Sequence, residues 1–220
     1  IQMANVTIIE SQSSNAAHNM DIRWQAILSG LGHTPTIVPQ TTLDNTAFFA
    51  STDLLIVSSG ILNLPANRVN TCLQWVMNGG PLYLQGEWQP SYTTNQGFAT
   101  IINGTGGTFS VGPTVAGQLN PTNVLNTYAT TPNTVVPLNY HWYGCSGAGC
   151  NNVEVIMQFG SNDIAWAYCP PNPAFGSVVQ TTDQDYIRNS TSPNLLRNIV
   201  HHLLNGPACS NPCGTILPSY

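Results

Sequence analysis

The chain has 220 residues, of which 42% are hydrophobic and 6% are charged, with four arginines, no lysine and a net charge of −5. So few cations exclude an electrostatic surface for nucleic acid or anionic lipid. No stretch reaches the roughly 18 apolar residues that would insert into a membrane, and the hydrophobic content excludes disorder. A polar surface made of Asn, Thr, Ser and Gln favours an extracellular or cell-surface protein over a cytosolic enzyme.

Strands and helices are expected to alternate along the first hundred residues. We expect strands at residues 5–9, 34–38, 53–58 and 81–85, and helices at residues 20–31, 43–49, 63–78 and 92–102. In the third of these helices Asn63 can cap the start, Pro65 fits the first turn, and Gly79 marks the end. This alternation predicts a mostly parallel sheet with right-handed crossovers.

The second half of the chain is less regular. Residues 104–150 are rich in Gly, Thr, Pro and Asn, which favours an irregular or β insertion. Strands follow at residues 153–159, 164–169 and 177–181, some of them antiparallel, and Ser192 and Pro193 open a last helix that ends near residue 206. We therefore expect one α/β domain over residues 1–208 and a Cys- and Pro-containing tail or linker over residues 209–220. Because the chain begins at Ile1, we expect part of a longer precursor.

Two pairs of cysteines lie close together in sequence within Gly- and Pro-rich segments. Cys145 with Cys150, and Cys209 with Cys213, have the spacing of small disulfide loops. Disulfides are typical of secreted and cell-surface proteins, because those compartments are oxidising. The cysteines therefore favour an extracellular location.

The other cysteines leave alternatives open. Cys72 falls on a helix and Cys169 at a strand end, and they either bridge or stay buried. Cys209 and Cys213, with His201 and His202 just upstream, also have a spacing that zinc accepts. The disulfide interpretation is preferred because the tail around these cysteines is made of Pro, Ser and Asn.

Two segments together resemble a known family. Residues 53–87 combine a strand, a capped helix, a Gly-Gly stop and a second strand that enters a glycine turn, and residues 176–206 form a strand, a turn and a closing helix. This order is similar to the class I glutamine amidotransferase-like superfamily, above all to its ThuA-like branch, over residues 4–103 and 153–206. The resemblance implies a flavodoxin-like three-layer sandwich.

The catalytic residues of that family are not found at the matching positions. The resemblance implies a Cys, or in the ThuA-like branch a His, on the turn after the strand at residues 81–85, and a His with an acid after the strand at residues 177–181. Here Gly86-Glu87-Trp88 and Asp183-Gln184-Asp185 stand at those positions. Nucleophilic attack needs a nucleophile and a base within hydrogen-bond reach. The fold is therefore expected without the reaction of the family.

Open α/β sheets bind ligands in the crevice beyond the carboxyl ends of their strands. The candidate residues that the predicted strand order brings to this crevice are Glu10, His18, Asp21, Glu87, Trp88, Tyr92, Asp183 and Asp185. Trp142 and Tyr143 form a further aromatic pair, which either covers the sheet, as we expect, or contacts a partner or sugar.

Three interpretations of the crevice stay open. The acidic side chains can cap helices and loops. They can instead bind a glycan or Ca²⁺, with Glu87 and Asp183 or Asp185 as acceptors and Trp88 or Tyr92 as a stacking surface. They can also serve a hydrolase in which Glu87 and one of the two aspartates act as acid and base.

We expect a non-catalytic secreted or cell-surface module with a structural, adhesive or glycan-binding role. The expected partners are like subunits of an extracellular assembly or filament, neighbouring domains of a longer protein, or carbohydrate. No cofactor is expected apart from the Ca²⁺ of the second interpretation. The alternative is an extracellular hydrolase that uses Glu87 with Asp183 or Asp185.

Overall fold

A computed structural model describes residues 3–11, 19–116, 123–135, 143–184, 187, 193–206 and 209. Its main sheet has eight strands in the order β2-β1-β3-β4-β10-β9-β8-β6. The strands are β1 (Asn5–Ile9), β2 (Thr34–Val38), β3 (Leu54–Val57), β4 (Leu82–Gly86), β6 (Asn123–Val124), β8 (Val153–Phe159), β9 (Asn162–Tyr168) and β10 (Val178–Thr182). The five strands from β2 to β10 are parallel, and β9, β8 and β6 continue the sheet in antiparallel pairing.

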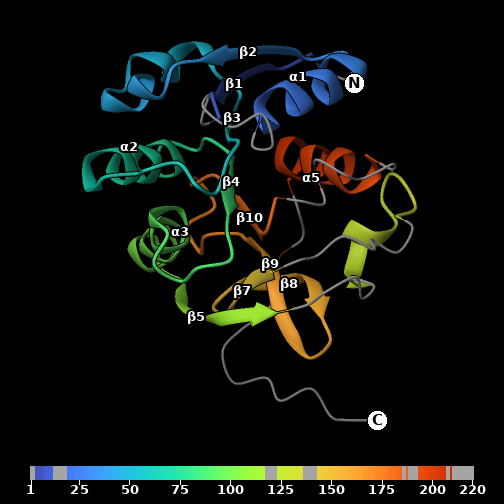
Figure 1. Ribbon diagram of the computed structural model, residues 1–220. Coiled ribbons are helices and arrows are strands. Elements are labelled where there is room, and N and C mark those ends of the chain that lie inside the picture. Colours follow the sequence, from blue (N-terminus) through green and yellow to red (C-terminus); the bar gives the residue numbers. More distant parts are fainter. Residues whose placement is uncertain are drawn as a thin grey trace.

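Helices cover both faces of this sheet (Figure 1). The α-helices are α1 (Met20–Gly30), α2 (Ala66–Met77), α3 (Thr93–Gly104) and α5 (Asn194–Asn205), and short 3-10 helices are η2 (Gln40–Asp44), η3 (Ala47–Ser51) and η4 (Asn126–Ala129). Helices α2 and α3 lie on one face, and α1 and α5 lie on the other. This arrangement is the flavodoxin-like three-layer sandwich expected from the sequence. Among the described helices, none has the length and apolar character needed to cross a membrane.

Each face of the sheet has its own apolar core. On the α1 and α5 side, Trp24 packs against Tyr83 with ring centroids 4.7 Å apart. On the α2 and α3 side, the ring of Phe98 lies 4.9 Å from that of Phe109. The central strand β3 is buried along its whole length, because its residues alternate between the two cores. The unbroken apolar run therefore correctly predicted burial on both faces.

The start of α2 differs from the prediction. Pro65, and not Asn63, is the N-cap residue, and no side chain caps the helix. The carbonyl of Pro65 accepts hydrogen bonds from the N–H groups of Arg68 and Val69. The end of the helix agrees with the sequence, because Gly79 adopts a φ of 89°, a conformation that glycine adopts without steric cost.

The region predicted as an irregular or β insertion contains two strands that do not belong to the main sheet. Strands β5 (Thr108–Ala116) and β7 (Tyr143–Cys150) form a separate antiparallel pair. Phe109 of β5 packs against Trp166 of β9 with ring centroids 4.9 Å apart, so this second sheet is anchored to the main one. In the same region β6 adds two residues to the edge of the main sheet.

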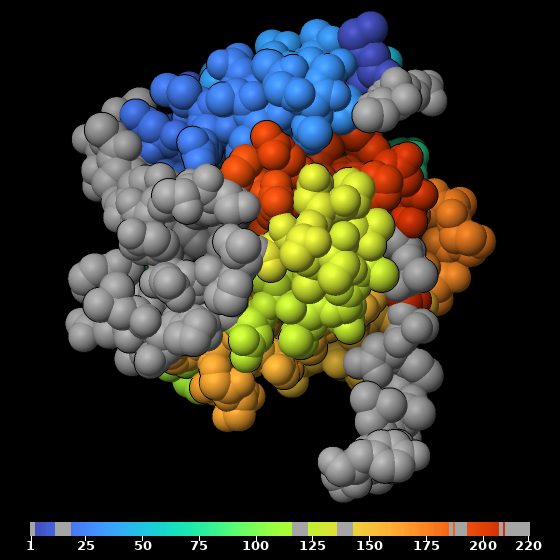
Figure 2. Space-filling view, turned by 90° about the vertical axis from the view of Figure 1, so that its right-hand side faces the viewer, coloured from blue at the N-terminus to red at the C-terminus, as the bar shows by residue number. Residues whose placement is uncertain are grey.

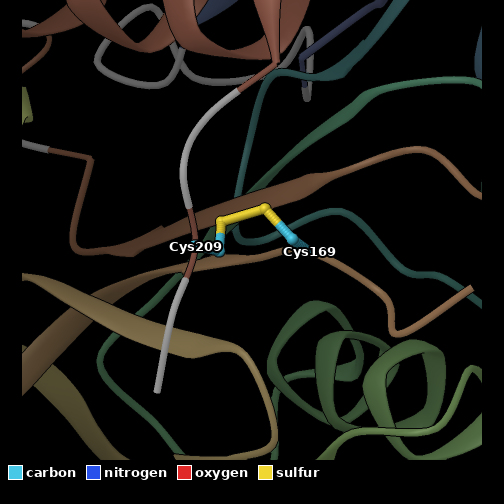
Figure 3. The surroundings of a disulfide bond; sticks show 2 residues. All are labelled: Cys169 and Cys209. Carbon is cyan, nitrogen blue, oxygen red and sulfur yellow. A yellow bond between two sulfur atoms is a disulfide. The ribbon is translucent and has the colours of Figure 1, made fainter. Parts of the chain in front are cut away.

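The predicted cysteine pairing is wrong. Cys169 forms a disulfide with Cys209, which links the end of β9 to the segment after α5 (Figure 3). Cys150 is also disulfide-bonded, whereas Cys145 is a free thiol. Cys213 lies outside the described residues.

Strand geometry explains why Cys145 and Cys150 do not pair. Both lie on the single strand β7, five positions apart. At roughly 3.3 Å per residue their Cα atoms are about 16 Å apart, far beyond the 5.6 Å that separates the Cα atoms of Cys169 and Cys209. Cys72 is buried as a free thiol, in accordance with one of the two alternatives left open for it.

One edge of the main sheet is formed by β2, which pairs only with β1 in the described part of the chain. The N–H of Thr34 donates to the carbonyl of Ala4, and the N–H of Glu10 donates to the carbonyl of Val38. Residues 34 and 38 therefore direct their backbone groups toward β1. Because successive residues of a strand bond to alternate sides, residues 35 and 37 direct theirs outward.

Candidate functional site

Parallel strands β1, β3, β4 and β10 end at the same edge of the sheet, where the sequence predicted a ligand crevice. Six of the candidate residues are described there: Glu10, Asp21, Glu87, Trp88, Tyr92 and Asp183. His18 and Asp185 lie outside the described residues, as does Trp142. The contacts of the described residues divide them into a buried acidic part and an exposed aromatic part.

Asp21 lies in the first turn of α1 and exchanges hydrogen bonds with Ser11. Its Oδ2 accepts the backbone N–H of Ser11 at 2.9 Å, and the Oγ of Ser11 accepts the backbone N–H of Asp21 at 3.0 Å. Ser58 donates its hydroxyl to the carbonyl of Ile9 at 2.7 Å, so in the 2.9 Å contact between the two serines Ser11 is the donor. Ser11 therefore links the first turn of α1 to the residue that follows β3.

Glu10 has a similar role one strand further toward the edge of the sheet. Its Oε1 accepts the backbone N–H of Gln40 at 3.2 Å, and its own N–H donates to the carbonyl of Val38. The residue therefore ties the end of β1 to the turn that follows β2. For Glu10 and Asp21, the interpretation as loop and helix caps agrees with the contacts.

Glu87 occupies the turn after β4 and is only 5% exposed. Its Oε2 accepts the backbone N–H of the next residue, Trp88, at 3.1 Å. The side chain of Asn95 on α3 accepts the N–H of Glu87 at 3.1 Å and donates to the carbonyls of Glu87 and Gln89 at 2.7 and 2.8 Å. Asn95 therefore fixes the backbone of this turn, a role that the sequence did not indicate.

A buried polar network lies beneath the turn, between β4 and β10. The hydroxyl of Tyr83 donates to Oε1 of Gln85 and lies 2.7 Å from the hydroxyl of Thr181. The Nε2 of Gln85 donates to the carbonyls of Thr181 and Gly86 at 2.8 and 2.7 Å. The signal for this network was visible in the sequence, because Gln85 follows the apolar residues of β4 and Thr181 follows the apolar start of β10. The network fills the interior below the crevice.

Asp183 follows β10 and is 3% exposed. Its φ of 78° lies in the left-handed region, which aspartate tolerates better than most residues. Just before it, the hydroxyl of Thr182 donates toward the carbonyls of Cys145 and Ile164 at 2.9 and 2.8 Å, and so joins β10 to β7 and β9. Asp183 and Glu87 are thus both buried, and neither presents an open carboxylate to solvent.

Three aromatic residues form an exposed surface beside Glu87, and we call this surface the aromatic patch: Trp88, Tyr92 and Tyr143. Trp88 is 37% and Tyr143 is 42% exposed, and their ring centroids lie 5.8 Å apart. The ring centroid of Tyr92 lies 6.5 Å from that of Trp88. The hydroxyl of Thr114 donates to the carbonyl of Trp88 at 2.8 Å. The expectation that Tyr143 covers the sheet is therefore wrong.

The electrostatic environment links the aromatic patch to Glu87. Burial, and secondly the negative charge of Glu87, raise the pKa of Tyr92. Tyr92 therefore stays protonated at neutral pH and keeps a hydroxyl donor at the patch. Among the described residues, no group of three or more His, Cys, Asp and Glu side chains could hold a metal ion.

Comparison with known proteins identifies the fold. No protein-family model matches the chain, and no curated protein sequence is significantly similar to it. Among solved structures, the mmIFT52 N-terminal domain superposes with a TM-score of 0.65 at 12% identity, covering 94% of this chain and 100% of that one. At such low identity the likeness defines the fold alone.

Two of the similar structures are ThuA-like proteins, in accordance with the resemblance inferred from the sequence. The one from Parabacteroides merdae has a TM-score of 0.58 at 13% identity, covering 99% of this chain and 95% of its own. The one from Bacteroides uniformis has a TM-score of 0.53 at 15% identity, covering 95% and 94%. The chain therefore shares the class I glutamine amidotransferase-like fold.

Proposed function

We propose that the chain is a non-catalytic, carbohydrate-binding module of an extracellular or cell-surface protein, and that the aromatic patch is its sugar contact. In this proposal the amidotransferase-like scaffold is retained without the reaction of that family. Residues 1–208 act as one domain, and residues 209–220 connect it to its neighbours.

The burial of Glu87 carries the non-catalytic part of the proposal. A hydrolase that used this residue would need its carboxylate in an open cleft, at a defined separation from a second carboxylate. Glu87 is instead 5% exposed and accepts the backbone N–H of Trp88. The side chain at the position of the family's nucleophile thus stabilises the turn, and the hydrolase alternative has no comparable observation in its favour.

The aromatic patch supports carbohydrate as the ligand. Aromatic rings offer a flat apolar surface on which the C–H face of a sugar can stack, and the tyrosine hydroxyls can bond to sugar hydroxyls. Trp88 and Tyr143 are among the five large hydrophobic side chains that are exposed in the described part of the chain, and they lie in contact with each other. A neutral ligand also suits a surface on which charges are scarce.

The proposed location and assembly rest on cysteines and charge. The Cys169–Cys209 disulfide is typical of an oxidising compartment. With charged residues at 6% of the chain, few charges would lose their solvation when like subunits or neighbouring domains pack together. These two observations support an extracellular assembly as the setting of the module.

The proposal is tested by binding to a panel of immobilised glycans, followed by titration calorimetry with any glycan that binds. We expect Trp88→Ala and Tyr143→Ala each to weaken binding about tenfold. Ile22→Ala is the matched control, because Ile22 is an exposed apolar residue on α1, 59% accessible and remote from the patch. Absence of binding to every glycan, or equal binding by Trp88→Ala, would contradict the proposal.

Two separate experiments test the hydrolase alternative and the self-association of the chain. If the protein releases sugar from any glycan of the panel and Glu87→Gln abolishes that release, the hydrolase alternative is correct. Sedimentation velocity of the purified chain at rising concentration tests self-association, and a strict monomer at all concentrations would count against the assembly of like subunits.

A further inference from the structure

A groove with a volume of about 650 Å³ lies at the opposite edge of the sheet from the aromatic patch. It is bordered by residues before β1, β3 and β4, by the segment that holds Pro132 and Asn133, and by the last turns of α5. Figure 2 shows three parts of the molecule side by side on this face, with the N-terminal elements in blue above, α5 in red and the segment after β6 in yellow-green. Its volume is in the range of sites for small organic ligands.

The groove contains a guanidinium group that is not neutralised within the described part of the protein. Of the four arginines in the chain, Arg68 pairs with Asp44 at 2.7 Å. Arg197 lines the groove and forms no ion pair with a described residue, and its Nη1 donates to Oδ1 of Asn194 at 3.2 Å. A guanidinium has five N–H donors in a fixed fork, and one bond to a described residue leaves most of them without a partner among those residues.

Two histidines of the groove add further donors. The Nδ1 of His33 accepts the backbone N–H of Ala4 at 3.3 Å, so the neutral ring carries its proton on Nε2. Burial lowers the pKa of His33, which favours this neutral form.

His201 has the same tautomer for a similar reason. The Nδ2 of Asn205 donates to the carbonyl of His201 at 2.8 Å, which identifies it as the amide nitrogen, and it lies 3.2 Å from Nδ1 of the same histidine. Nδ1 is therefore the acceptor and Nε2 carries the proton. Both histidines that line the groove thus offer an N–H donor.

The other residues of the groove indicate the chemistry of the remaining part of the ligand. The acidic side chain of the groove, Asp53, already accepts the backbone N–H of Asn5 at 2.7 Å. Leu31, Leu203, Leu204 and Pro81 provide apolar surface. The groove therefore combines one guanidinium, two imidazole N–H donors and an apolar wall.

We propose that this groove binds a small organic monocarboxylate with an apolar body, whose carboxylate pairs with Arg197 and accepts from His33 and His201. Arginine and carboxylate match in a bidentate geometry. One guanidinium neutralises one negative charge, whereas a phosphate dianion would leave excess charge close to Asp53. The site is independent of the aromatic patch and of any sugar bound there.

The test uses the full chain and two probes, octanoate and 3-phenylpropanoate, titrated at neutral pH by calorimetry and by two-dimensional NMR. We expect at least one probe to bind, and octanamide, which has the same apolar body without the charge, to bind about tenfold more weakly. The amide signals of residues around His33 and Arg197 should shift, and those around Trp88 should not.

Matched variants of two arginines test whether Arg197 is the residue that pairs with the carboxylate. Arg197→Gln should weaken the binding of the carboxylate probe at least about tenfold, and Arg68→Gln should leave it unchanged. If Arg197→Gln does not fold, as judged by circular dichroism, Arg197→Lys serves instead and should bind more weakly than the wild type because the fork is lost. No binding of either probe up to about 10 mM, equal binding by the Arg197 variant, or NMR shifts confined to the aromatic patch would overturn the proposal.

Discussion

Gly60 and Glu87 lie so close together that a Cβ atom added to Gly60 would be 2.6 Å from the Cγ of Glu87. The same Cβ would be 2.2 Å from the carbonyl oxygen of Gly86. The hydroxyl of Thr94 donates to the carbonyl of Gly60 at 2.6 Å and holds this approach from the side of α3. The loops after β3 and β4 are therefore in direct contact at Gly60 and Glu87, and no space for a ligand remains at this contact.

Gly60→Ala should consequently destabilise the protein. The added methyl group meets backbone atoms, which cannot move aside as a flexible side chain could, and overpacking of this kind costs about 2–3 kcal/mol. The free energy of unfolding in urea measures the effect. Gly30→Ala on α1 is the control, because an added Cβ there has no neighbour within 4 Å. We expect that control to be neutral or slightly stabilising, and equal stability of the two variants would show that the contact at Gly60 is wrong.

Asn95→Ala should destabilise the turn that carries Glu87 and Trp88. The substitution removes three hydrogen bonds and leaves the buried backbone groups of Glu87 and the partly buried carbonyl of Gln89 without these partners, at a cost of about 2–4 kcal/mol. Urea unfolding again provides the measurement. Its neighbour Gln96 is the control, because it makes one exposed bond to the carbonyl of Pro90. A loss from Asn95→Ala no larger than that from Gln96→Ala would contradict the assigned role.

Mass spectrometry of the unreduced protein should yield a cross-linked peptide that contains Cys169 and Cys209. Cys72 and Cys145 should react with a thiol reagent after unfolding without reductant. The double variant with alanine at positions 169 and 209 should lose about 2–4 kcal/mol, because the bridge restricts the unfolded chain. A cross-link between Cys145 and Cys150 would show that the pairing described here is wrong.

His202 should make the protein less stable in acid. The side chain is buried against Tyr128, with ring centroids 4.3 Å apart, and burial lowers its pKa below 6.5. The unfolded chain therefore binds a proton more readily than the folded protein. The stabilisation is complete above pH 6.5 and is lost as the pH falls through the lowered pKa of the folded state.

The measurement is the free energy of unfolding as a function of pH. His202→Phe fills the same space without a titratable group, so it should reduce the loss of stability in acid. His201→Gln, a substitution at the adjacent and more exposed position, should leave most of that loss in place, because burial is the main cause of the lowered pKa of His202 and the charge of His201 a lesser one. His33, whose pKa burial also lowers, adds a loss of the same sign in every variant. A pH profile unchanged by His202→Phe would refute the prediction.

Local sequence patterns predicted most of the regular structure. The bounds of β1 and β2 agree with the prediction to the residue, because short apolar runs are enclosed by polar or glycine-containing segments. The start of α2 was placed too early, since Pro65 itself takes the extended conformation of the N-cap. The cysteine pairing could not be deduced, because closeness in sequence places Cys145 and Cys150 on one extended strand.

The position of the candidate site in the fold was predicted from the sequence, but the roles of its residues were predicted only in part. Topology alone brought Asp21 and Glu87 to the carboxyl edge of the sheet. Their partners could not be predicted in the same way, because Ser11 and Asn95 lie ten and eight positions away and are oriented by the packing of α1 and α3. The exposure of Tyr143 could not be predicted either, because it depends on how the second sheet, which contains β7, packs beside the main sheet.

Pro35 is the second residue of the edge strand β2, and it is one of the two residues whose backbone groups point outward. Proline has no N–H, so a strand that approached this edge would find a carbonyl without its neighbouring donor. Extension of this sheet from one molecule to the next is therefore disfavoured at that edge. If the protein forms filaments, we expect contacts at this edge to be made by side chains, because a continuous ladder of backbone hydrogen bonds is interrupted at Pro35.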